Sequence, residues 1–507
     1  MNVATSNGRQ AHKRNRLLAA GMMVVVAVAL VATFGVATAQ AATITYNLYA
    51  TDAYIPLADG TCIYNYGFVG GRAGQALTFQ NSVKPDGTFD PAAGQWASFI
   101  YQDNTTIDTG APTPVGGPVT DAEKPLLGNA QFPAPLIYCR VGDVVQINFK
   151  NLGVTNPGAP NDPHSIHLHG LDVNAANDGV PETSVGAVPA NAVDNSGNPV
   201  PGAGNVVVYM FSPQKAGTYF YHCHQEADIH VQMGMYGAIV VYNKTDAAAD
   251  FGPGTGHGGS LFGWSYDKDY VLLESEIDTR QHGSEETSGN FNPVDYHPEY
   301  WCLNGLSFPN TIHVGLPGGW DNWIKAHPGY DPFITGSVSR THTNTCVPKG
   351  DKVLLRMINM GFETQPMHMH GFHAKVIGSD QRAWTWANLG NVTPWNSGLE
   401  KQTLTIGSGE EYDWLINMGL QKVNSTYPAG TQTRYDETGQ PVPNTVASAS
   451  PILSPDGNPY IAGSPVTGAV GIPTPGQLFP FHNHDDYKAT NNGVYPGGQF
   501  TMIMTMP

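Results

Sequence analysis

A histidine, a cysteine and a second histidine stand in succession near the middle of the chain, at His222, Cys223 and His224. Residues on a β-strand alternate between its two faces, so the two imidazoles would point one way and the thiol the other. Residues two apart on a strand are separated by about 6.6 Å, which is close enough to serve neighbouring metal ions. The tripeptide can therefore hold one metal by sulfur and others by nitrogen, with a short covalent path for electrons between them.

Residues downstream of the cysteine supply most of a copper site. His230 follows Cys223 by seven residues, and Met235 follows His230 by five. Two histidines, a cysteine and a weak axial methionine form a type 1 copper site, so one histidine is missing from this segment. His164 is the candidate, because it precedes His167 by three residues and would face the opposite side of a regular strand.

Histidine pairs separated by one residue occur at corresponding places in each half of the chain. The members of each pair share a strand face, and eight imidazoles, which are normal copper ligands, would suit a cluster of three copper ions. The second half has Gln365 in place of His164 and Asn483 in place of Cys223, so it keeps the imidazole pairs and lacks the sulfur site. The pairs are His167 and His169, His222 and His224, His368 and His370, and His482 and His484.

Short strands joined by many turns are expected to position these residues. The chain has 59 glycines and 39 prolines and only 13% charged residues, a composition typical of all-β proteins. The halves form an internal repeat, which predicts one domain at 42–245 and a second at 263–507, joined by a polar, glycine-rich linker at 246–262. Strands are predicted at 43–49, 206–211, 218–223, 236–242, 270–274, 352–359 and 499–506.

The N-terminus indicates an export signal. Basic residues precede the apolar run 17–37, and Ala39-Gln40-Ala41 is a small-x-small cleavage site. We therefore expect residues 1–41 to be a signal peptide of a periplasmic, cell-envelope or secreted protein that is not held in a membrane after cleavage. The apolar run is also long enough for an uncleaved membrane anchor.

Charge and cysteine content narrow the function classes further. The formal net charge of −17 argues against nucleic acid as a partner. With Cys223 binding copper, four cysteines remain, and an exported protein is expected to pair them. The simplest of three pairings is Cys62 with Cys139 and Cys302 with Cys346.

The motifs resemble those of the multicopper oxidases, laccase-like enzymes built from cupredoxin β-sandwiches. The resemblance covers most of 43–245 and 262–507 and is strongest at 164–170, 222–235, 368–370 and 482–484. Because only the first half has the sulfur site, the chain is most similar to the two-domain members of the family. The resemblance implies two cupredoxin-like Greek-key β-sandwiches with long loop insertions.

The resemblance also implies a role for each motif residue, and four copper ions per chain. Asp178 in Asp-Gly-Val-Pro matches an acidic residue thought to aid proton delivery, and Cys223 is the path for electrons. The seven-residue step from Cys223 to His230 departs from the five residues of many laccases. Type 1 copper would be bound by His164, Cys223, His230 and Met235, type 2 copper by His167 and His368, and the type 3 pair by His169, His222, His224, His370, His482 and His484.

The implied reaction is oxidation of a reducing substrate coupled to reduction of O2 to water. The electron donor would be a phenol, an aromatic amine or a metal ion, and the sequence does not distinguish these. Because the three-copper cluster takes histidines from both domains, and two-domain relatives combine domains of neighbouring chains, we expect a homotrimer.

Two other functions are compatible with parts of the pattern. A copper nitrite reductase also has two cupredoxin domains, but it needs only one type 2 copper with three histidines, and it has no use for His224 or for both His482 and His484. A copper carrier or electron-transfer protein would not need a His-Cys-His segment joined to further imidazole pairs. Copper content separates the three, with four, two, and one or a variable number of ions per chain.

Overall fold

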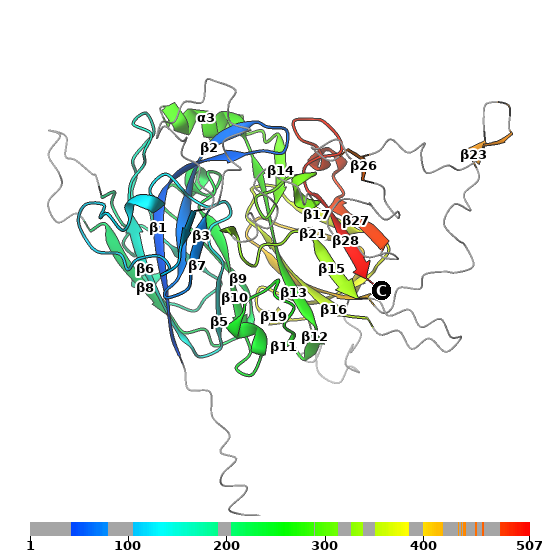
Figure 1. Ribbon diagram of the computed structural model, residues 1–507, viewed down its shortest axis with the longest axis horizontal. Coiled ribbons are helices and arrows are strands. Elements are labelled where there is room, and N and C mark those ends of the chain that lie inside the picture. The colour runs from blue at the N-terminus through cyan, green and yellow to red at the C-terminus, as the bar shows by residue number, and fades with distance from the viewer. Residues whose placement is uncertain are drawn as a thin grey trace, which may run out of the picture. The chain divides into compact units, whose positions relative to one another are not determined.

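The computed structural model describes residues 42–79, 105–190, 204–287, 289–312, 326–337, 350–384, 399–418 and 477–506, with short pieces between 434 and 460 (Figure 1). The predicted signal peptide at 1–41 lies outside the described residues, as does Cys346. Among the described residues, no helix combines the length and hydropathy needed to cross a bilayer.

The first sandwich consists of two four-stranded sheets. Strand β1 pairs with β6 in parallel and with β2 in antiparallel orientation. Inward side chains of both sheets, such as Leu48, Ile147, Tyr221 and Ile239, form one buried core. The first sheet has the order β2 (Cys62–Arg72), β1 (Thr43–Pro56), β6 (Val144–Asn151) and β8 (Val206–Phe211), and the second has the order β5 (Ile137–Arg140), β10 (Tyr236–Tyr242), β9 (Gly217–His222) and β7 (His167–His169).

The second sandwich repeats this plan, with β13 parallel to β16 as β1 is to β6. Its own core lies between its two sheets and includes Leu272, Leu355, Met367 and Trp414. The third sheet of the chain has the order β14 (Tyr300–Leu303), β13 (Lys268–Ile277), β16 (Lys352–Asn359), β22 (Glu411–Asn417), β18 (Ala374–Ser379) and β19 (Arg382–Ala383), with β20 (Leu399–Lys401) also paired to β18, and the fourth has the order β15 (Ile334–Ser337), β28 (Phe500–Met506), β27 (Gln477–Asn483), β17 (Gln365–Met369) and β21 (Thr403–Ile406).

A further core joins the second sheet to the third. Phe220 and Val240 from the second sheet pack with Val271, Leu273 and other buried residues of the third. Thr218 on β9 donates a hydrogen bond to Asp413 on β22 at 2.7 Å, in the same buried layer. The four sheets therefore stack in order, and the side chains of β9 alternate between the first core and the third sheet.

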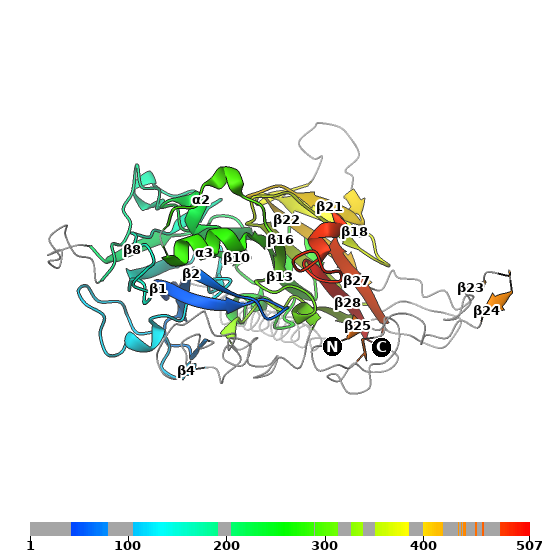
Figure 2. The same cartoon turned by 90° about the horizontal axis from the view of Figure 1, so that it is seen from above.

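Helices are short and lie at the edges of the sheets. Helix α3 (Thr279–Thr287) lies over β2 (Figure 2). There His282 Nδ1 is 2.6 Å from the carbonyl oxygen of Tyr64, and Gln281 Nε2 donates to the carbonyl of Asp228 in α2 (Ala227–His230) at 3.1 Å. The remaining elements are the ribbons β3 (Leu77–Phe79) with β4 (Thr105–Ile107), β11 (Gly259–Leu261) with β12 (Trp264–Tyr266), β23 (Arg434–Tyr435) with β24 (Pro441–Val442), and β25 (Ile452–Leu453) with β26 (Pro459–Tyr460), and the 3₁₀ turns η3 (Lys124–Leu126), η4 (Ala175–Asn177), η5 (Ala247–Asp250), η6 (Pro293–Asp295), η7 (Asn310–Ile312) and η11 (Asp486–Ala489).

The predicted all-β, cupredoxin-like fold is confirmed. The predicted strands 206–211, 236–242 and 352–359 coincide with β8, β10 and β16. The predicted strand 43–49 is too short, because β1 continues to Pro56 along its pairing with β2.

The predicted Cys62–Cys139 disulfide is wrong, because both residues are free thiols. Cys62 begins β2, whereas Cys139 lies near Arg72 at the other end of that strand. Ten residues of a strand span about 33 Å, which is too far for a disulfide. Cys302 is a free, buried thiol as well, so the predicted pairing of Cys302 with Cys346 is also wrong.

Candidate metal centres

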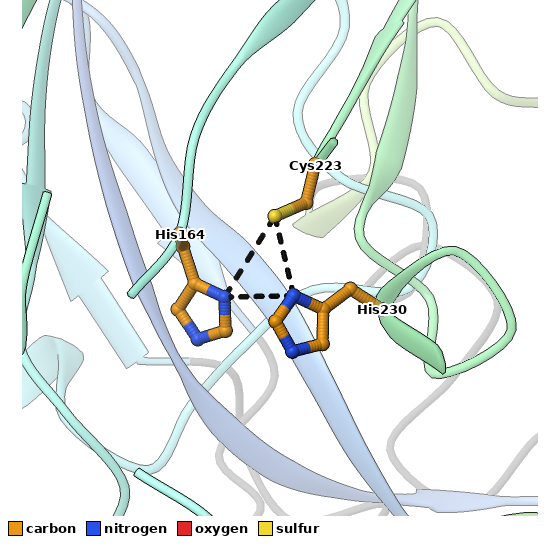
Figure 3. Close-up of side chains that lie close together, drawn as sticks. All are labelled: His164, Cys223 and His230. Atoms are coloured by element: carbon orange, nitrogen blue, oxygen red, sulfur yellow. Dashed lines mark hydrogen bonds between the residues drawn. The ribbon is translucent and has the colours of Figure 1, made fainter. Parts of the chain in front are cut away.

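His164, Cys223 and His230 converge on one buried point in the first sandwich (Figure 3). Cys223 Sγ lies 3.3 Å from His230 Nδ1 and 3.8 Å from His164 Nδ1, and the two nitrogens are 3.3 Å apart. At most 3% of any of the three residues is exposed. Three such donor atoms around one point fit a His₂Cys copper site.

Three segments far apart in the chain bring these residues together. His164 forms an isolated bridge with Ala187, Cys223 directly follows β9, and His230 ends α2. Met235 N donates to the carbonyl of His230 and Cys223 N donates to the carbonyl of Met235, both at 3.0 Å. The fully buried Met235 therefore lies beside the cysteine, as the predicted axial ligand requires.

The charges in this centre favour a bound cation. Burial alone would lower the pKa of His230, but the nearby Cys223 and Asp162 raise that pKa to about 10. Burial and His230 lower the pKa of His164 well below its ordinary value. Without a metal, His230 therefore carries a positive charge next to the sulfur, whereas His164 is neutral. A bound copper ion would replace the proton of His230 as the positive charge at this point.

The first half-site, defined as His167, His169, His222 and His224, lies on the other face of the same strands. Ring centroids are 5.1 Å apart for His167 and His222, 5.2 Å for His167 and His224, and 5.6 Å for His222 and His224. His167 Nδ1 is 2.8 Å from the carbonyl oxygen of Asp178, and His222 Nδ1 is 2.9 Å from that of Cys223. A carbonyl only accepts, so these Nδ1 atoms carry the hydrogen and Nε2 presents its lone pair.

His169 has a different neighbour, which comes from the second sandwich. Its ring stacks on Phe220 with centroids 4.0 Å apart, and its buried Nδ1 has no hydrogen-bond partner. Glu411 Oε1 on β22 lies 3.7 Å from that nitrogen. Burial and the adjacent Asp380 raise the pKa of Glu411 to about 10, so this carboxyl keeps a proton at neutral pH. Sequence reasoning missed Glu411, because only the stacking of the second and third sheets brings it here.

The second half-site, defined as His368, His370, His482 and His484, has the same arrangement. Ring centroids are 4.9 Å apart for His368 and His370, 5.0 Å for His368 and His484, and 5.2 Å for His370 and His482. His482 Nδ1 is 2.8 Å from the carbonyl oxygen of Asn483, and His370 Nε2 is 3.1 Å from His482 Nε2. These Nε2 atoms therefore face a shared point.

Burial favours the neutral form of five of the eight half-site imidazoles, which is the form that binds metals. It lowers the pKa of His222 to about 3 and that of His169 to about 4. Burial also lowers the pKa values of His368, His370 and His482. The donor chemistry of both half-sites therefore fits copper.

The two half-sites lie on opposite sides of the second sandwich. The contact with Glu411 places the first against the third sheet. Met367, Met369 and Phe481 face the core between the third and fourth sheets, so the alternating His368, His370 and His482 face away from it. Packed sheets are about 10 Å apart, whereas ions of one cluster are separated by about 4 Å. The half-sites of one chain therefore do not form one cluster.

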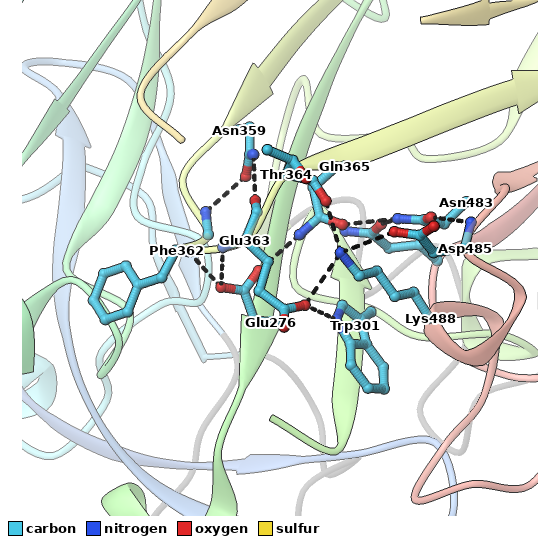
Figure 4. A network of polar contacts seen from close by, with 12 residues as sticks. Glu276, Trp301, Asn359, Phe362, Glu363, Thr364, Gln365, Asn483, Asp485 and Lys488 are labelled. Carbon is cyan, nitrogen blue, oxygen red and sulfur yellow. Dashed lines mark hydrogen bonds and ion pairs between the residues drawn. The ribbon is translucent and has the colours of Figure 1, made fainter. Parts of the chain in front are cut away.

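Amides occupy the place in the second sandwich that corresponds to the sulfur site (Figure 4). Asn483 Nδ2 donates to Gln365 Oε1 and to Gln499 Oε1, each at 2.7 Å. Asn483 N donates to the carbonyl of Gln499 at 2.9 Å, as Cys223 N does to that of Met235. Gln499 is thus the counterpart of Met235, and the three amides satisfy one another without a metal.

A lysine supplies positive charge at the edge of this network. Lys488 Nζ donates to the carbonyl of Thr364 at 2.6 Å and lies 3.2 Å from Glu363 Oε2 and 3.4 Å from Asp485 Oδ2 (Figure 4). Gln365 Nε2 donates to the buried Glu276 at 2.8 Å. Hydrogen bonds between side-chain amides and the ammonium group of Lys488 therefore stabilise the second sandwich at the place that corresponds to the sulfur site.

Comparisons with known proteins agree with the motifs. A family model described as multicopper oxidase matches residues 95–245 and 326–416. Dihydrogeodin oxidase of Aspergillus terreus is 24% identical over 303 residues, which are 59% of this chain and 39% of that protein. Copper resistance protein A homolog of Pseudomonas syringae pv. tomato is 31% identical over 271 residues, which are 50% of this chain and 39% of that protein.

The chain thus spans about two fifths of the length of these curated relatives. Among solved structures, the blue copper oxidase of Nitrosomonas europaea is 19% identical, with a TM-score of 0.48, over 91% of this chain and 86% of that one. The copper nitrite reductase of the same organism is 13% identical, with a TM-score of 0.43, over 92% of this chain and 94% of that one.

Proposed function

Because this chain belongs to the multicopper oxidases, we propose that it couples one-electron oxidation of a reducing substrate to four-electron reduction of O2 to two waters. The observation that carries the proposal is the segment His222-Cys223-His224, whose sulfur joins one cluster of metal-binding side chains and whose imidazoles join another. A phenol, an aromatic amine or a metal ion would serve as the donor.

The chain's own residues would hold four copper ions. His164, Cys223, His230 and Met235 would hold the type 1 ion, and the two half-sites would hold the type 2 ion and the type 3 pair. When bound, copper supplies reversible one-electron chemistry and a place for O2. The backbone of Cys223 links the sulfur to both flanking imidazoles, which shortens the path for electrons to a few covalent bonds.

Two carboxyl groups beside the first half-site would handle protons. Asp178 Oδ1 lies 3.2 Å from His167 Nδ1, and Glu411 holds its proton 3.7 Å from His169 Nδ1. Reduction of O2 to water consumes four protons, so carboxyls next to the ligands suit their delivery. Asp178 is the residue expected from the sequence, and Glu411 is added by the fold.

We propose that the three-copper cluster forms between chains of a homotrimer, because the half-sites of one chain do not meet. Exposed apolar side chains flank both half-sites. Met210, 46% exposed on the edge strand β8, is bonded through its backbone N–H to Asn177, next to Asp178. Tyr487, 56% exposed, follows His484 by three residues. Head-to-tail contact between two such different surfaces gives a closed ring when the rotation between neighbours closes, and a threefold rotation gives a trimer.

The proposal includes export to the periplasm, cell envelope or medium, supported by the sequence of residues 1–41. It also includes the division into domains at 42–245 and 263–507 with the linker 246–262. The two four-histidine half-sites favour an oxidase over a nitrite reductase or a copper carrier, neither of which uses eight imidazoles.

Copper analysis and oxygen uptake test the proposal together. Copper-loaded protein is expected to contain four ions per chain and to consume O2 with a phenol, Fe²⁺ or Mn²⁺ as donor. Two ions per chain with reduction of nitrite would instead establish the reductase, and no turnover with either acceptor would leave a carrier.

A further inference from the structure

A cavity of about 280 Å³ lies between the edges of the two sheets of the first sandwich. The edge strands there are β2 and β5. The two sheets are joined beside the cavity, because Tyr138 N donates to the hydroxyl of Tyr46 at 2.9 Å and that hydroxyl donates to the carbonyl of Tyr138 at 3.2 Å. Residues 251–253 and 326–330 form further walls, so segments from both halves of the chain enclose this space.

The cavity is separate from the metal centres. Arg72 lines the cavity at the end of β2, whereas Tyr66, six residues earlier, has its ring centroid 5.8 Å from that of His230. Six residues of a strand span about 20 Å. No predicted copper ligand is among the described residues that line the cavity. A molecule bound here would therefore not touch the copper ligands.

The guanidinium group of Arg72 is available to a ligand in this cavity. Its Cζ atom lies 5.4 Å from the centroid of the Tyr138 ring, a contact that favours one position of the cation. Within the part of the chain that the structure describes, the Arg72 side chain has no ion pair and no hydrogen bond. The nearby Asp250 is bonded to Arg140 at 2.6 Å, and that bond, with the charges of Arg140 and Arg72, lowers the pKa of Asp250. Arginine binds carboxylates through two parallel hydrogen bonds, so Arg72 can hold a carboxylate from outside the chain.

A buried acceptor elsewhere in the cavity wall has no hydrogen-bond partner. Gln131 is 5% exposed, and its Oε1 is unpaired. Its Nε2 donates to the carbonyl of Ala326, and because a carbonyl only accepts, this bond fixes which end of the amide is the oxygen. Gln131 bridges to Phe68 on β2, four residues or about 13 Å before Arg72. A buried polar atom without a partner costs free energy, so a hydroxyl group of a bound molecule would be stabilised here, at a distance from the guanidinium.

Apolar side chains supply much of the remaining wall. Leu77, Leu136 and Pro133 line the cavity, and so does the ring of Phe251, which is 51% exposed. Burying an aromatic ring against such surfaces is favourable. An inorganic anion such as phosphate has no apolar part and would leave these side chains in contact with water. The walls therefore favour a ligand with a flat apolar ring.

We propose that this cavity binds an aromatic carboxylate that carries a hydroxyl group at the end of the ring opposite to the carboxylate. The carboxylate would accept hydrogen bonds from Arg72, the ring would lie against the apolar walls, and the hydroxyl would donate to Gln131 Oε1. The formal net charge of −17 disfavours anions over the surface as a whole, so binding depends on this one guanidinium. The inference does not rest on the oxidase function, because the cavity shares no ligand with the metal centres.

Calorimetric titration of the copper-loaded protein with 4-(hydroxymethyl)benzoate tests the site. The probe is an alcohol rather than a phenol, so its binding is separate from electron donation to copper. Two related compounds each lack one of the groups that the cavity would recognise. The neutral 4-(hydroxymethyl)benzamide should bind about tenfold or more weakly than the acid, because it loses the charge-assisted hydrogen bonds. The compound without a hydroxyl, 4-methylbenzoate, should bind about fivefold more weakly than the probe.

Variants of the cavity wall then locate the binding. Arg72→Gln should weaken binding of the probe about tenfold or more and remove the preference for the acid over the amide. Gly71→Leu should abolish binding by occupying the cavity. A Cβ atom at Gly71 would have only Leu77 Cδ1 within 4 Å, at 3.8 Å, so the backbone accepts a side chain there. Arg382→Gln is the matched control, because it removes the same charge from an exposed place on β19, and it should bind the probe as the parent does.

The outcomes separate this site from the metal centres. Absence of binding to the parent, equal affinity for the acid and the amide, or binding that Arg72→Gln and Gly71→Leu leave unchanged would overturn the inference. Uptake of O2 by copper-loaded protein should be the same in the parent, Arg72→Gln and Arg382→Gln. Failure of O2 uptake in all three would contradict the oxidase, and the titration would still decide whether the cavity binds the aromatic acid.

Discussion

Mixing two differently damaged chains should restore an activity that neither has alone. One chain carries His167→Ala and His169→Ala, which remove half of the first half-site. The other carries His482→Ala and His484→Ala, which do the same to the second half-site. Each variant by itself lacks ligands for the three-copper cluster, so neither should reduce O2.

The expected recovery follows from the position of the half-sites. Because two sheets of the second sandwich separate them within a chain, each cluster must combine the first half-site of one chain with the second half-site of its neighbour. In a random equal mixture, half of the first half-sites and half of the second are intact. About a quarter of the clusters are then complete, and each complete cluster lies next to an intact Cys223.

The assay is co-expression of the two variants with different affinity tags, followed by sequential purification and O2 uptake. Selection with both tags removes trimers of a single chain type, so activity per trimer should be about a third of the parental value. The copper content of these mixed trimers should also exceed that of either variant alone, because about a third of the three-copper clusters are complete.

A matched mixture provides the control. Chains with His167→Ala and His169→Ala are combined with chains with His222→Ala and His224→Ala, so that every first half-site is damaged. This mixture should stay inactive. Equal activity of the complementary and the control mixtures would refute assembly of the cluster between chains.

Three further changes probe separate parts of the structure. Cys223→Ser should lower copper from four ions to three per chain and abolish the intense visible absorption, as measured by metal analysis and spectroscopy. Burial lowers the pKa of His282 to about 4 from 6.5, so the unfolded chain binds its proton first, and the free energy of unfolding should fall by up to about 3 kcal/mol as pH drops from 6.5 to 4. In urea titrations, His282→Gln, whose amide can still donate to the carbonyl of Tyr64, should reduce that pH dependence. Asn483→Leu should lower the free energy of unfolding by about 2 kcal/mol, because it leaves the buried amide of Gln365 without its donor; an unchanged denaturation midpoint would contradict this role.

The local pattern of the sequence was sufficient for the strands and for each pair of ligands. Alternation along a strand depends only on neighbouring residues, so it correctly placed Cys223 on the face opposite His222 and His224. The same rule separated His164 from His167 and His169. The repeat likewise placed Gln365 and Asn483 where the first half has its sulfur site.

Contacts between layers could not be predicted in this way. Whether two distant segments meet depends on the stacking of whole sheets, which is set by apolar surfaces summed over many residues. The Cys62–Cys139 pairing failed for this reason, since the packing places Cys139 near Arg72, at the end of β2 away from Cys62. The sequence did not identify Gln499 as the counterpart of Met235, because the number of residues from Asn483 to Gln499 differs from the number from Cys223 to Met235.

The sequence by itself therefore determined the ligand types, their strand faces and the single sulfur site, because these follow from residue identity and a two-residue period. Only the tertiary structure decided that Glu411 reaches His169 and that α3, from beyond the linker, packs on the first sandwich. It also decided that the two half-sites of one chain face apart. These features depend on how four sheets and one short helix pack, and packing is a property of the whole chain.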